Sequence, residues 1–398
     1  MTMPIVALLT TISIALIVYH HAIYPLLLQF LGNRRRQACH DDDCDEALQS
    51  HQLPSITILL PAYNEERFIA DKIRNLAFLD YPRDKLKIII ASDGSTDSTC
   101  RVALETLREA ECRHCNIKVI QFRKNRGKIA VLNSMISEVE SDILALSDVS
   151  ALISIDALKM AAKRFRDPEV AVVNGCYRLL NPGSAGEQKY WEFQSRLKAN
   201  EASLGSAIGS HGAFYLIRTR LYQSLPDDTI NDDFIIPMRI VQQGYRSVYE
   251  DSIFALELEQ ADTSQDSHRR YRISAGNLQQ ALRLRALLSP RYRGTAFTFA
   301  SGKVLRVLMP YLMVSALVGS LYLAPVHPVF LLSAILQTSI YGLYLLLEAL
   351  RLGDSVKLLQ TLKYLLRGHL NNLKGSIGYV ATGIGKILRE QPAHKPLR

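Results

Sequence analysis

Long apolar stretches at both ends of the chain restrict its fold more than any other feature. Residues 5–31, 307–324 and 326–347 contain no aspartate, glutamate, lysine or arginine. A helix needs about 20 predominantly apolar residues to cross a bilayer. We therefore expect three membrane-spanning helices, with a large polar region between the first and the second.

Basic residues beside these stretches predict which side of the membrane the polar region occupies. Arginines fill positions 34–36, Lys303 and Arg306 precede the second stretch, and Arg351 and Lys357 follow the third. Positively charged flanks stay on the cytoplasmic side. The first stretch has no basic residue before it and is too long for a secretory signal core, which favours an uncleaved anchor over a cleaved signal. We expect a multi-pass protein of the cell inner membrane with a cytoplasmic middle region.

The net charge of +9 fits this arrangement. Basic residues are concentrated at 283–306 and 351–398, beside the apolar stretches, where a cation near anionic lipid contributes about 1 kcal/mol. Their position argues against nucleic-acid binding. The cysteines do not form a disulfide framework, and Cys112 with Cys115 supplies only half of a zinc site.

Composition divides the chain into six segments. Basic residues alternate with apolar ones at 283–306, which is typical of an interfacial amphipathic helix. Residues 356–388 have a similar pattern and could either span the membrane or lie on it. The expected order is an N-terminal transmembrane anchor (1–33), a polar linker (34–54), an α/β domain (55–282), an interfacial helix (283–306), a transmembrane hairpin (307–350) and a basic cytosolic or interfacial tail (351–398).

In the α/β domain, short apolar runs alternate with helical spacing. Strands are predicted at 55–60, 86–92, 117–121 and 142–146, and helices at 65–79, 96–110 and 127–139. This alternation predicts a mostly parallel sheet with crossover helices. Beyond residue 165 the alternation weakens, and we expect a strand at 170–174, a helix at 187–204, a strand within 209–217 and a helix at 233–243.

Aspartates follow two of the predicted strands. Asp93 ends the strand at 86–92, and Asp148 follows the strand at 142–146. Open α/β sheets bind ligands at the carboxyl ends of their strands. A further pair, Asp232 and Asp233, precedes a predicted helix. These carboxylates predict a nucleotide and metal site at a membrane surface.

The first two strand ends offer groups for a nucleotide. Tyr63 presents a ring on which a base could stack, and the helix start beside it suits an anion. Asp93 could accept hydrogen bonds from a ribose or a uracil N–H, and Gly94 lets the backbone approach. The alternatives are a simple turn capped by Asn64 and a helix cap in the stretch that holds Asp93.

A diphosphate and its metal ion would need the next groups. Lys128 opens a helix after a glycine and could meet a diphosphate. Asp148 could hold Mg²⁺ or Mn²⁺, which take one or two carboxylates plus phosphate oxygens and water. Ser150 points to the same side in extended chain and could be a weak ligand. A solvated surface charge at Lys128 and a turn cap at Asp148 are the alternatives.

Two later groups could complete the chemistry. Adjacent carboxylates such as Asp232 and Asp233 can take different protonation roles, so one could act as a base toward a hydroxyl. An arginine of the segment 269–273 could clamp a pyrophosphate from the other side. The alternatives are acids favoured by a helix dipole and a basic patch at the membrane surface.

The order and spacing of these motifs resemble the membrane-bound family 2 glycosyltransferases, which include cellulose, chitin and hyaluronan synthases and ceramide glucosyltransferases. The resemblance covers residues 55–280. It implies a GT-A fold, an α/β domain with the sugar donor at the carboxyl edge of its sheet. It also implies nucleotide-sugar contacts by Pro61, Tyr63, Glu65, Asp93, Lys128, Arg269 and Arg272, acceptor contacts by Gly209, Ser210, His211 and Gly212, metal binding by Asp148 and Ser150, and catalysis by Asp233 beside Asp232.

Two positions depart from the family pattern. Ser150 replaces the second acid of the D-x-D motif, so the metal would depend on Asp148 and the donor phosphates. Ile273 replaces the tryptophan of Q-x-x-R-W, which weakens the argument for processive polymerisation.

The resemblance implies an inverting glycosyltransferase that uses Mg²⁺ or Mn²⁺ and a nucleotide-sugar, with UDP-sugar as the expected donor. The expected acceptor is a membrane-proximal glycan, in polysaccharide synthesis and with possible partner subunits. Transfer to a lipid is the alternative within the same chemistry. A catalytically inactive membrane scaffold is the alternative outside it.

Overall fold

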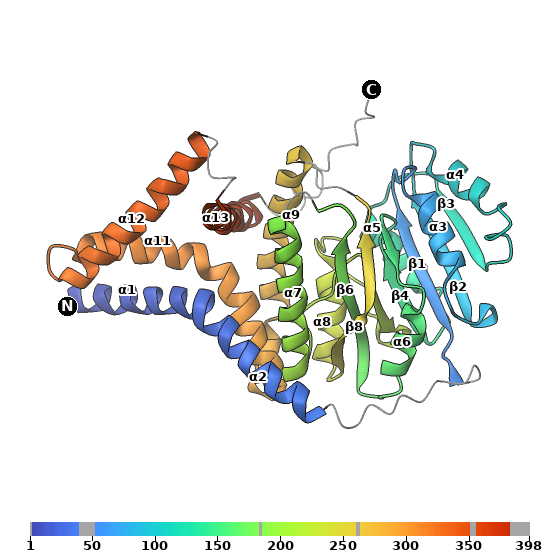
Figure 1. Cartoon of the computed structure of the whole chain (residues 1–398), viewed down its shortest axis with the longest axis horizontal. Helices are drawn as coiled ribbons and strands as arrows, with labels where there is room; N and C mark the ends of the chain where they lie inside the picture. Colours follow the sequence, from blue (N-terminus) through green and yellow to red (C-terminus); the bar gives the residue numbers. More distant parts are fainter. Residues whose placement is uncertain (1, 40–51, 183–184, 260–262, 351–355, 383–398) are drawn as a thin grey trace. The chain divides into compact units, whose positions relative to one another are not determined.

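The computed structural model describes residues 2–39, 52–182, 185–259, 263–350 and 356–382 (Figure 1). These residues form two compact units. The sheet unit contains residues 31–262 and 284–296. The helical unit contains the chain up to residue 30, residues 263–283, and the chain from residue 297 to the end of the last described helix.

The sheet unit is built on eight strands in the order β3-β2-β1-β4-β7-β6-β8-β5. Strands β1, β2, β3 and β4 pair in parallel, which confirms the prediction for the first half of the domain. Strand β7 runs antiparallel to β4 and β6, and β5 runs antiparallel to β8, so the sheet is mixed, with four parallel and three antiparallel pairings. The strands are β1 (Ile56–Ala62), β2 (Leu86–Asp93), β3 (Ile117–Phe122), β4 (Ile143–Ser147), β5 (Ala151–Ile153), β6 (Val170–Leu179), β7 (Phe214–Arg218) and β8 (Arg246–Glu257).

Continuous apolar runs explain the central strands. Strands β1, β2 and β4 are buried along nearly their whole length, because helices cover the sheet (Figure 1). Burying one isoleucine or leucine stabilises the fold by about 1.5–3 kcal/mol. The covering helices are α3 (Ile69–Ala77), α4 (Thr99–Thr106), α5 (Lys128–Ile136), α6 (Ala157–Arg164), α7 (Ala185–Leu204) and α8 (Asp232–Gln242).

The second half of the sheet was only partly predicted. Strand β6 extends five residues beyond the predicted end at residue 174, and β8 was missed. Strand β8 carries charged residues in its middle and pairs with β6 across an irregularity between Gly175 and Cys176. Its extended shape therefore depends on a partner strand far away in sequence.

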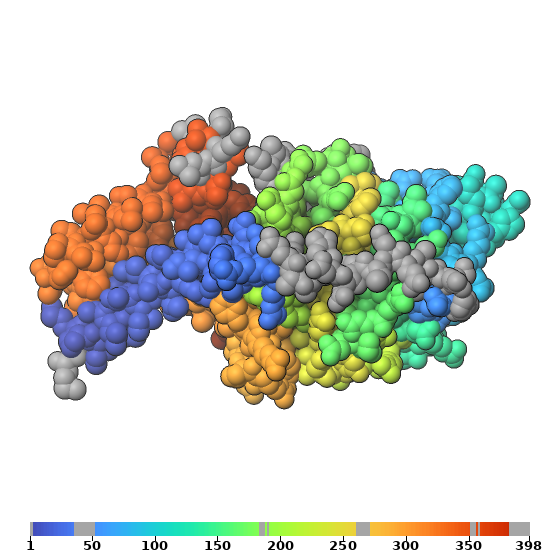
Figure 2. Space-filling model, turned by 60° about the horizontal axis from the view of Figure 1, so that its bottom comes forward, coloured from blue at the N-terminus to red at the C-terminus, as the bar shows by residue number. Residues whose placement is uncertain are grey.

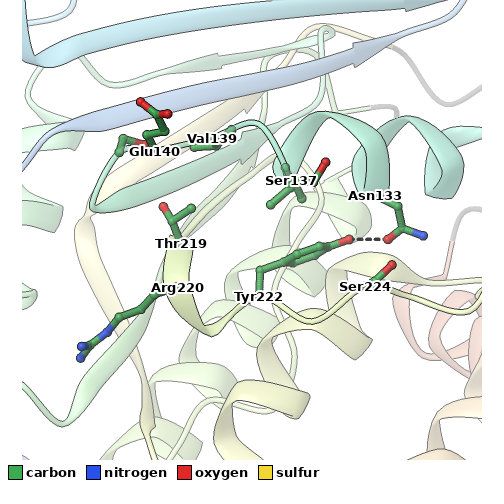
Figure 3. Close-up of a pocket in the computed structure, with 10 residues that line it drawn as sticks. Asn133, Ser137, Val139, Glu140, Thr219, Arg220, Tyr222 and Ser224 are labelled. Carbon is green, nitrogen blue, oxygen red and sulfur yellow. Dashed lines mark hydrogen bonds between the residues drawn. The ribbon is translucent and has the colours of Figure 1, made fainter.

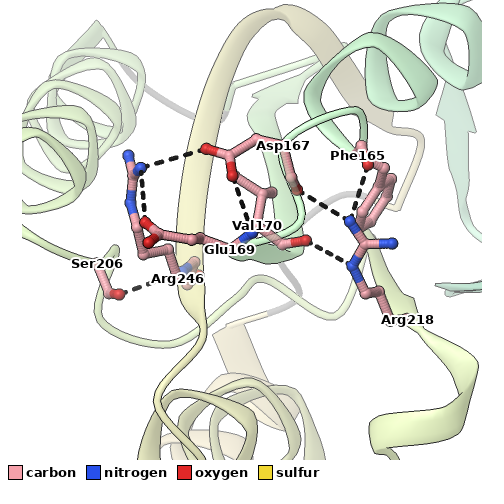
Figure 4. A network of polar contacts seen from close by, with 8 residues as sticks. Phe165, Asp167, Glu169, Val170, Ser206, Arg218 and Arg246 are labelled. Carbon is pink, nitrogen blue, oxygen red and sulfur yellow. Dashed lines mark hydrogen bonds and ion pairs between the residues drawn. The ribbon is translucent and has the colours of Figure 1, made fainter.

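Two arginines fix the turn that precedes β6 (Figure 4). Arg218 donates to the carbonyls of Phe165 and Asp167 at 2.8 and 2.9 Å. Arg246 lies 3.4 Å from a carboxylate oxygen of Asp167. Because Arg218 pairs with Ile143 in the ladder, this network lies at the amino end of β4, opposite the end that leads to Asp148.

The helical unit contains the apolar stretches. Among the described residues, three helices are long and apolar enough to cross a membrane: Met3–Arg35, Gly294–Leu323 and Pro328–Ala349. Their exposed leucines and valines, such as Leu332 and Val318, suit a lipid environment and indicate a membrane protein. Its elements are α1 (Thr2–Val18), the π-helix η1 (Tyr19–Ile23), the part of α2 (Tyr24–Cys39) up to Phe30, α9 (Thr263–Arg283), the π-helix η7 (Phe299–Val304), α11 (Leu305–Leu323), α12 (Pro328–Ala349) and α13 (Lys357–Thr382).

Helix α11 contacts both α1 and α12 in this unit, and Figure 2 shows the N-terminal helix (blue) lying against the orange helices of the same unit. The Gly319 backbone approaches Thr10 so closely that an added methyl group would overlap the threonine hydroxyl. Small residues allow such approaches between membrane helices.

Two predicted boundaries were wrong. Helix α2 continues to Cys39, so the first residues of the expected linker are helical. Residues 283–306 do not form one interfacial helix: they contain two 3₁₀ turns, η5 (Arg285–Leu288) and η6 (Pro290–Tyr292), and then α10 (Gly294–Thr298), which begins the long helix. Pro290 forces extended backbone at Ser289, and Arg293 has a positive φ of 50°, so a continuous helix is excluded.

Candidate active site

A lysine and three aspartates meet at the carboxyl edge of the sheet. Asp148 follows β4, Asp232 and Asp233 open α8, and Lys128 opens α5. The Lys128 Nζ atom lies 3.2 Å from Asp148 Oδ1 and 3.3 Å from Asp232 Oδ2. Residues separated by more than 100 positions thus form one polar cluster, in which Asp148 lies at a strand end as predicted.

The loop 209–213 passes between the carboxylates of this cluster. A methyl group added to Gly212 would lie 2.9 Å from Asp148 Oδ2 and 3.6 Å from Asp233 Oδ2. The backbone ties the loop to the same two residues, because Ser210 N donates to the Asp233 carbonyl at 3.0 Å and Asp148 N donates to the Ala213 carbonyl at 3.3 Å. The loop and the acids therefore form one rigid arrangement.

Side chains of α7 and β6 support this loop. Lys198 of α7 donates to the carbonyls of Ile208 and Gly209 at 3.0 and 2.8 Å. The His211 ring stacks on Tyr177 with centroids 3.8 Å apart and meets Trp191 edge-on at 5.4 Å. The predicted acceptor residues 209–212 thus lie on a supported loop beside the acids.

The electrostatics of the cluster separate its two adjacent aspartates. The pKa of Asp233 is raised to about 6: burial raises it most, the neighbouring Asp232 carboxylate adds to the shift, and Lys128 opposes it. Burial lowers the pKa of Lys128, but Asp148, Asp232 and Asp233 outweigh burial and hold it well above its usual range. Lys128 therefore stays charged, and Asp233 has the properties of a general base near neutral pH.

Asp93 holds the start of the helix that carries Lys128. Its carboxylate is buried and accepts hydrogen bonds from Arg126 N at 2.9 Å and Gly127 N at 2.8 Å. Gly94 beside it touches the same loop, since an added methyl group would lie 2.4 Å from Asn125 N. Asp93 therefore links β2 to α5. Its predicted contact with the nucleotide stays a prediction.

The loops after β1 and β2 are cross-linked. Asn64 has a positive φ of 57° and its Oδ1 accepts from Thr96 N at 2.8 Å, while Glu65 N donates to Thr99 Oγ1 at 2.8 Å. Burial raises the pKa of Glu65 to about 8, with the carboxylates of Glu259 and Asp148 adding to the shift. Glu65 is therefore near enough to Asp148 for the two carboxylates to repel each other. Pro61 lies near the end of β1, and Tyr63 lies in the loop that follows β1.

Asp148 and Ser150, the two residues expected to bind the metal ion, differ in accessibility. Asp148 is 40% exposed, whereas Ser150 is buried and its hydroxyl is hydrogen-bonded to the Glu257 carboxylate. Among the residues that the structure describes, no three of His, Cys, Asp and Glu are placed to hold a metal ion. Asp148 is therefore accessible to an ion that takes its other ligands from phosphates and water.

Comparison with known proteins identifies the family. The family model described as "Glycosyltransferase like family 2" matches residues 54–276, more than half of the chain. The chain belongs to this glycosyltransferase family. The resemblance inferred from the sequence is confirmed, and the protein is a glycosyltransferase.

Curated relatives resemble part of this family 2 glycosyltransferase. The poly-beta-1,6-N-acetyl-D-glucosamine synthase of Staphylococcus aureus is 28% identical over 207 residues, which cover 50% of this chain and 48% of the relative. The synthase of Staphylococcus epidermidis is 25% identical over 210 residues, covering 51% of this chain and 49% of the relative. The chain spans about half the length of these relatives.

A solved structure shares the whole fold. The mannosyltransferase from Pyrobaculum calidifontis, solved with GDP-Man and Mn²⁺, superposes with a TM-score of 0.71 at 21% identity. The match covers 94% of this chain and 99% of the other. It confirms the GT-A fold with apolar helices at both ends.

The arginines of the Q-x-x-R-W-like segment lie on α9, in the helical unit of the glycosyltransferase. Arg272 is partly buried. Contacts of Arg269 and Arg272 with a donor diphosphate stay predictions.

Sequence reasoning missed several residues near the cluster. Tyr215 on β7 is fully buried, and its hydroxyl has no hydrogen-bond partner within the described part of the chain. Burial, followed by Asp232 and Asp233, raises its pKa, so the hydroxyl stays protonated near these carboxylates. Lys198 and Trp191 support the loop 209–213. None gave a signal in the sequence, because each acts through a distant contact.

A cavity of about 440 Å³ lies elsewhere in the glycosyltransferase (Figure 3). Its lining includes Asn133, Ser141, Arg220 and Tyr222, and the Tyr222 hydroxyl donates to Asn133 Oδ1 at 2.7 Å. It contains none of the predicted site residues and lies at the amino end of β4. It is therefore separate from the acid cluster.

Proposed function

We propose that this protein transfers a sugar from a UDP-sugar to a glycan acceptor with inversion at the anomeric carbon. One observation carries the proposal: Lys128, Asp148, Asp233 and Gly212 converge at the carboxyl edge of the sheet. They supply a cation, a metal-binding carboxylate, a base and an open loop at one place.

Asp233 is the catalytic base. Its raised pKa suits removal of a proton from an acceptor hydroxyl near neutral pH, and a positioned base typically contributes about 10²–10⁴-fold. The activated hydroxyl attacks the anomeric carbon from the face opposite the UDP group. Asp232 is ion-paired to Lys128 and holds that cation in place.

Charge develops on the UDP leaving group during transfer. We propose that Lys128 and Arg272 contact the phosphates. The nucleotide is contacted by Pro61, Tyr63, Glu65 and Asp93. A Mg²⁺ or Mn²⁺ ion bound at Asp148 would neutralise part of the diphosphate charge. Ser150 is a poor direct ligand, because its hydroxyl is engaged with Glu257.

The acceptor approaches along the loop 209–212. Similarity to polysaccharide synthases supports a glycan acceptor in polysaccharide synthesis. The basic flanks of the apolar helices support a multi-pass arrangement in the cell inner membrane, with the sheet unit cytoplasmic. Ile273, which stands where the family pattern has a tryptophan, supports the second candidate, transfer to a lipid acceptor.

A donor screen tests the proposal. Membranes containing the full chain would be incubated with labelled UDP-sugars and Mn²⁺ and then extracted with organic solvent. Label in the aqueous polymer fraction supports a glycan acceptor, and label in the organic phase supports a lipid. Asp233→Asn membranes are the control. If the protein neither binds nor consumes any UDP-sugar, the proposal is wrong. The alternative of a non-catalytic membrane scaffold is then favoured.

A further inference from the structure

Lys72 is a buried lysine for which the proposed mechanism has no role. It lies on α3 within the apolar stripe formed by Ile69, Ile73 and Leu76, and its side chain is fully buried. Among the described residues, no carboxylate lies within ion-pair distance of its ammonium group. Placing a charge in an apolar interior is costly unless something compensates, so a helix residue of this kind calls for a specific explanation.

The Lys72 ammonium binds both ends of the segment that carries the metal-binding residues. Its Nζ atom donates to Ser147 Oγ at 2.7 Å and to the carbonyl of Ala151. Ser147 ends β4 and Ala151 begins β5, so the two contacts enclose the turn 148–150. This turn contains Asp148 and Ser150.

The same network reaches the acceptor loop. The Ser147 hydroxyl accepts from Lys72 and donates to the Ala213 carbonyl at 2.7 Å. The Ala213 carbonyl also accepts from Asp148 N. Through these hydrogen bonds, the Lys72 side chain fixes the Asp148 backbone relative to α3. It also fixes that backbone relative to the loop 209–213.

We propose that Lys72 is a positioning residue that holds the turn 148–150 in the geometry through which Asp148 binds the metal ion. The inference rests on the proposed function. Ser150 contributes no second carboxylate, so the metal site depends on the placement of a single acid. Rigid support of that acid has the largest effect where no other acid can compensate for its movement.

The test measures metal binding by the full-length protein. Free Mn²⁺ would be titrated by electron paramagnetic resonance with saturating UDP, so the readout does not depend on turnover. Lys72→Met keeps the side-chain length and removes the hydrogen bonds. Loss of a residue that orients a metal ligand typically weakens metal affinity by about 10–100-fold, and we expect a change of that size.

Asn75 provides a matched control on the same helix. Its side chain donates to the Ile153 carbonyl and accepts from Ile153 N, both at 2.9 Å. Asn75→Ala therefore removes two hydrogen bonds to β5 at a point farther from Asp148. For Asn75→Ala we expect a lower melting temperature and an Mn²⁺ affinity equal to that of the wild-type protein. Ser147→Ala removes one acceptor of Lys72 and should weaken Mn²⁺ binding to an intermediate degree; it decides the question if Lys72→Met does not fold.

Three results would overturn the inference. Unchanged Mn²⁺ affinity in both Lys72→Met and Ser147→Ala excludes the positioning role. Tighter Mn²⁺ binding in Lys72→Met would mean that the lysine acts only as a repelling charge. Equal losses in Lys72→Met and Asn75→Ala would mean a general loss of stability. If the wild-type protein itself binds no Mn²⁺ with UDP, the proposed function fails instead.

Discussion

Replacing Gly212 by alanine tests the arrangement of the active site with one methyl group. The new carbon would lie 2.9 Å from Asp148 Oδ2, whereas ordinary contacts begin at 3.4 Å. The two atoms must therefore separate by about 0.5 Å. Gly212 does not have a positive φ, so alanine is compatible with its backbone.

The size of the expected effect follows from this displacement. A catalytic constellation must be held within about 0.5 Å of its productive geometry, and a displacement of about 1 Å can cost 10²-fold in rate. We expect transfer to fall by about 10–10²-fold. Glycine-to-alanine changes at compatible positions stabilise proteins by about 0.4–1 kcal/mol, which offsets part of the contact strain. The melting temperature should therefore change little.

The assay compares sugar transfer, Mn²⁺ affinity in the presence of UDP, and thermal unfolding. Gly342→Ala is the control, because an added methyl group in α12 meets no atom within 4 Å. It should leave all three measurements unchanged. A Gly212→Ala protein with wild-type transfer and wild-type Mn²⁺ affinity would show that the loop does not lie against Asp148.

Three further predictions concern the acids. Asp233→Asn should lower transfer by about 10²–10⁴-fold with UDP affinity unchanged, measured by product formation and by calorimetry; near-wild-type turnover would remove Asp233 as the base. Because the base acts in its deprotonated form and its pKa is raised to about 6, transfer should be lost as the pH falls through about 6, and a pH–rate profile with its acid limb near 4 would contradict this. Asp148→Ala should abolish the gain in UDP affinity that Mn²⁺ produces, and an unchanged gain would exclude Asp148 from the metal site.

The sequence predicted the parts of the site that follow directly from local patterns. Asp93 and Asp148 each come after a continuous apolar run, and parallel strands bring such ends to one edge. The three apolar helices were equally clear, because length and hydropathy alone identify them. Strand β8 was missed, since its charged residues are extended only through pairing with β6.

One further residue is marked as unusual by the sequence pattern alone. The apolar stripe of α3 places Lys72 on the buried face between Ile69 and Leu76, where a lysine is out of place. The pattern marks the residue as unusual. It does not say that the ammonium meets Ser147 and Ala151, which lie more than 70 positions away.

The sequence by itself determined which groups are available: the strands, the spanning helices, and the acids and cations at strand ends and helix starts. Only the tertiary structure decided which of these groups contact one another and which protonation state each one takes. Lys128 pairs with Asp232, the Gly212 backbone leaves no room for a methyl group beside Asp148, and Asp233 is half-buried with a raised pKa. The physical reason is that apolar periodicity acts over a few residues, whereas charge, burial and close contact depend on segments that meet only when the sheet is assembled.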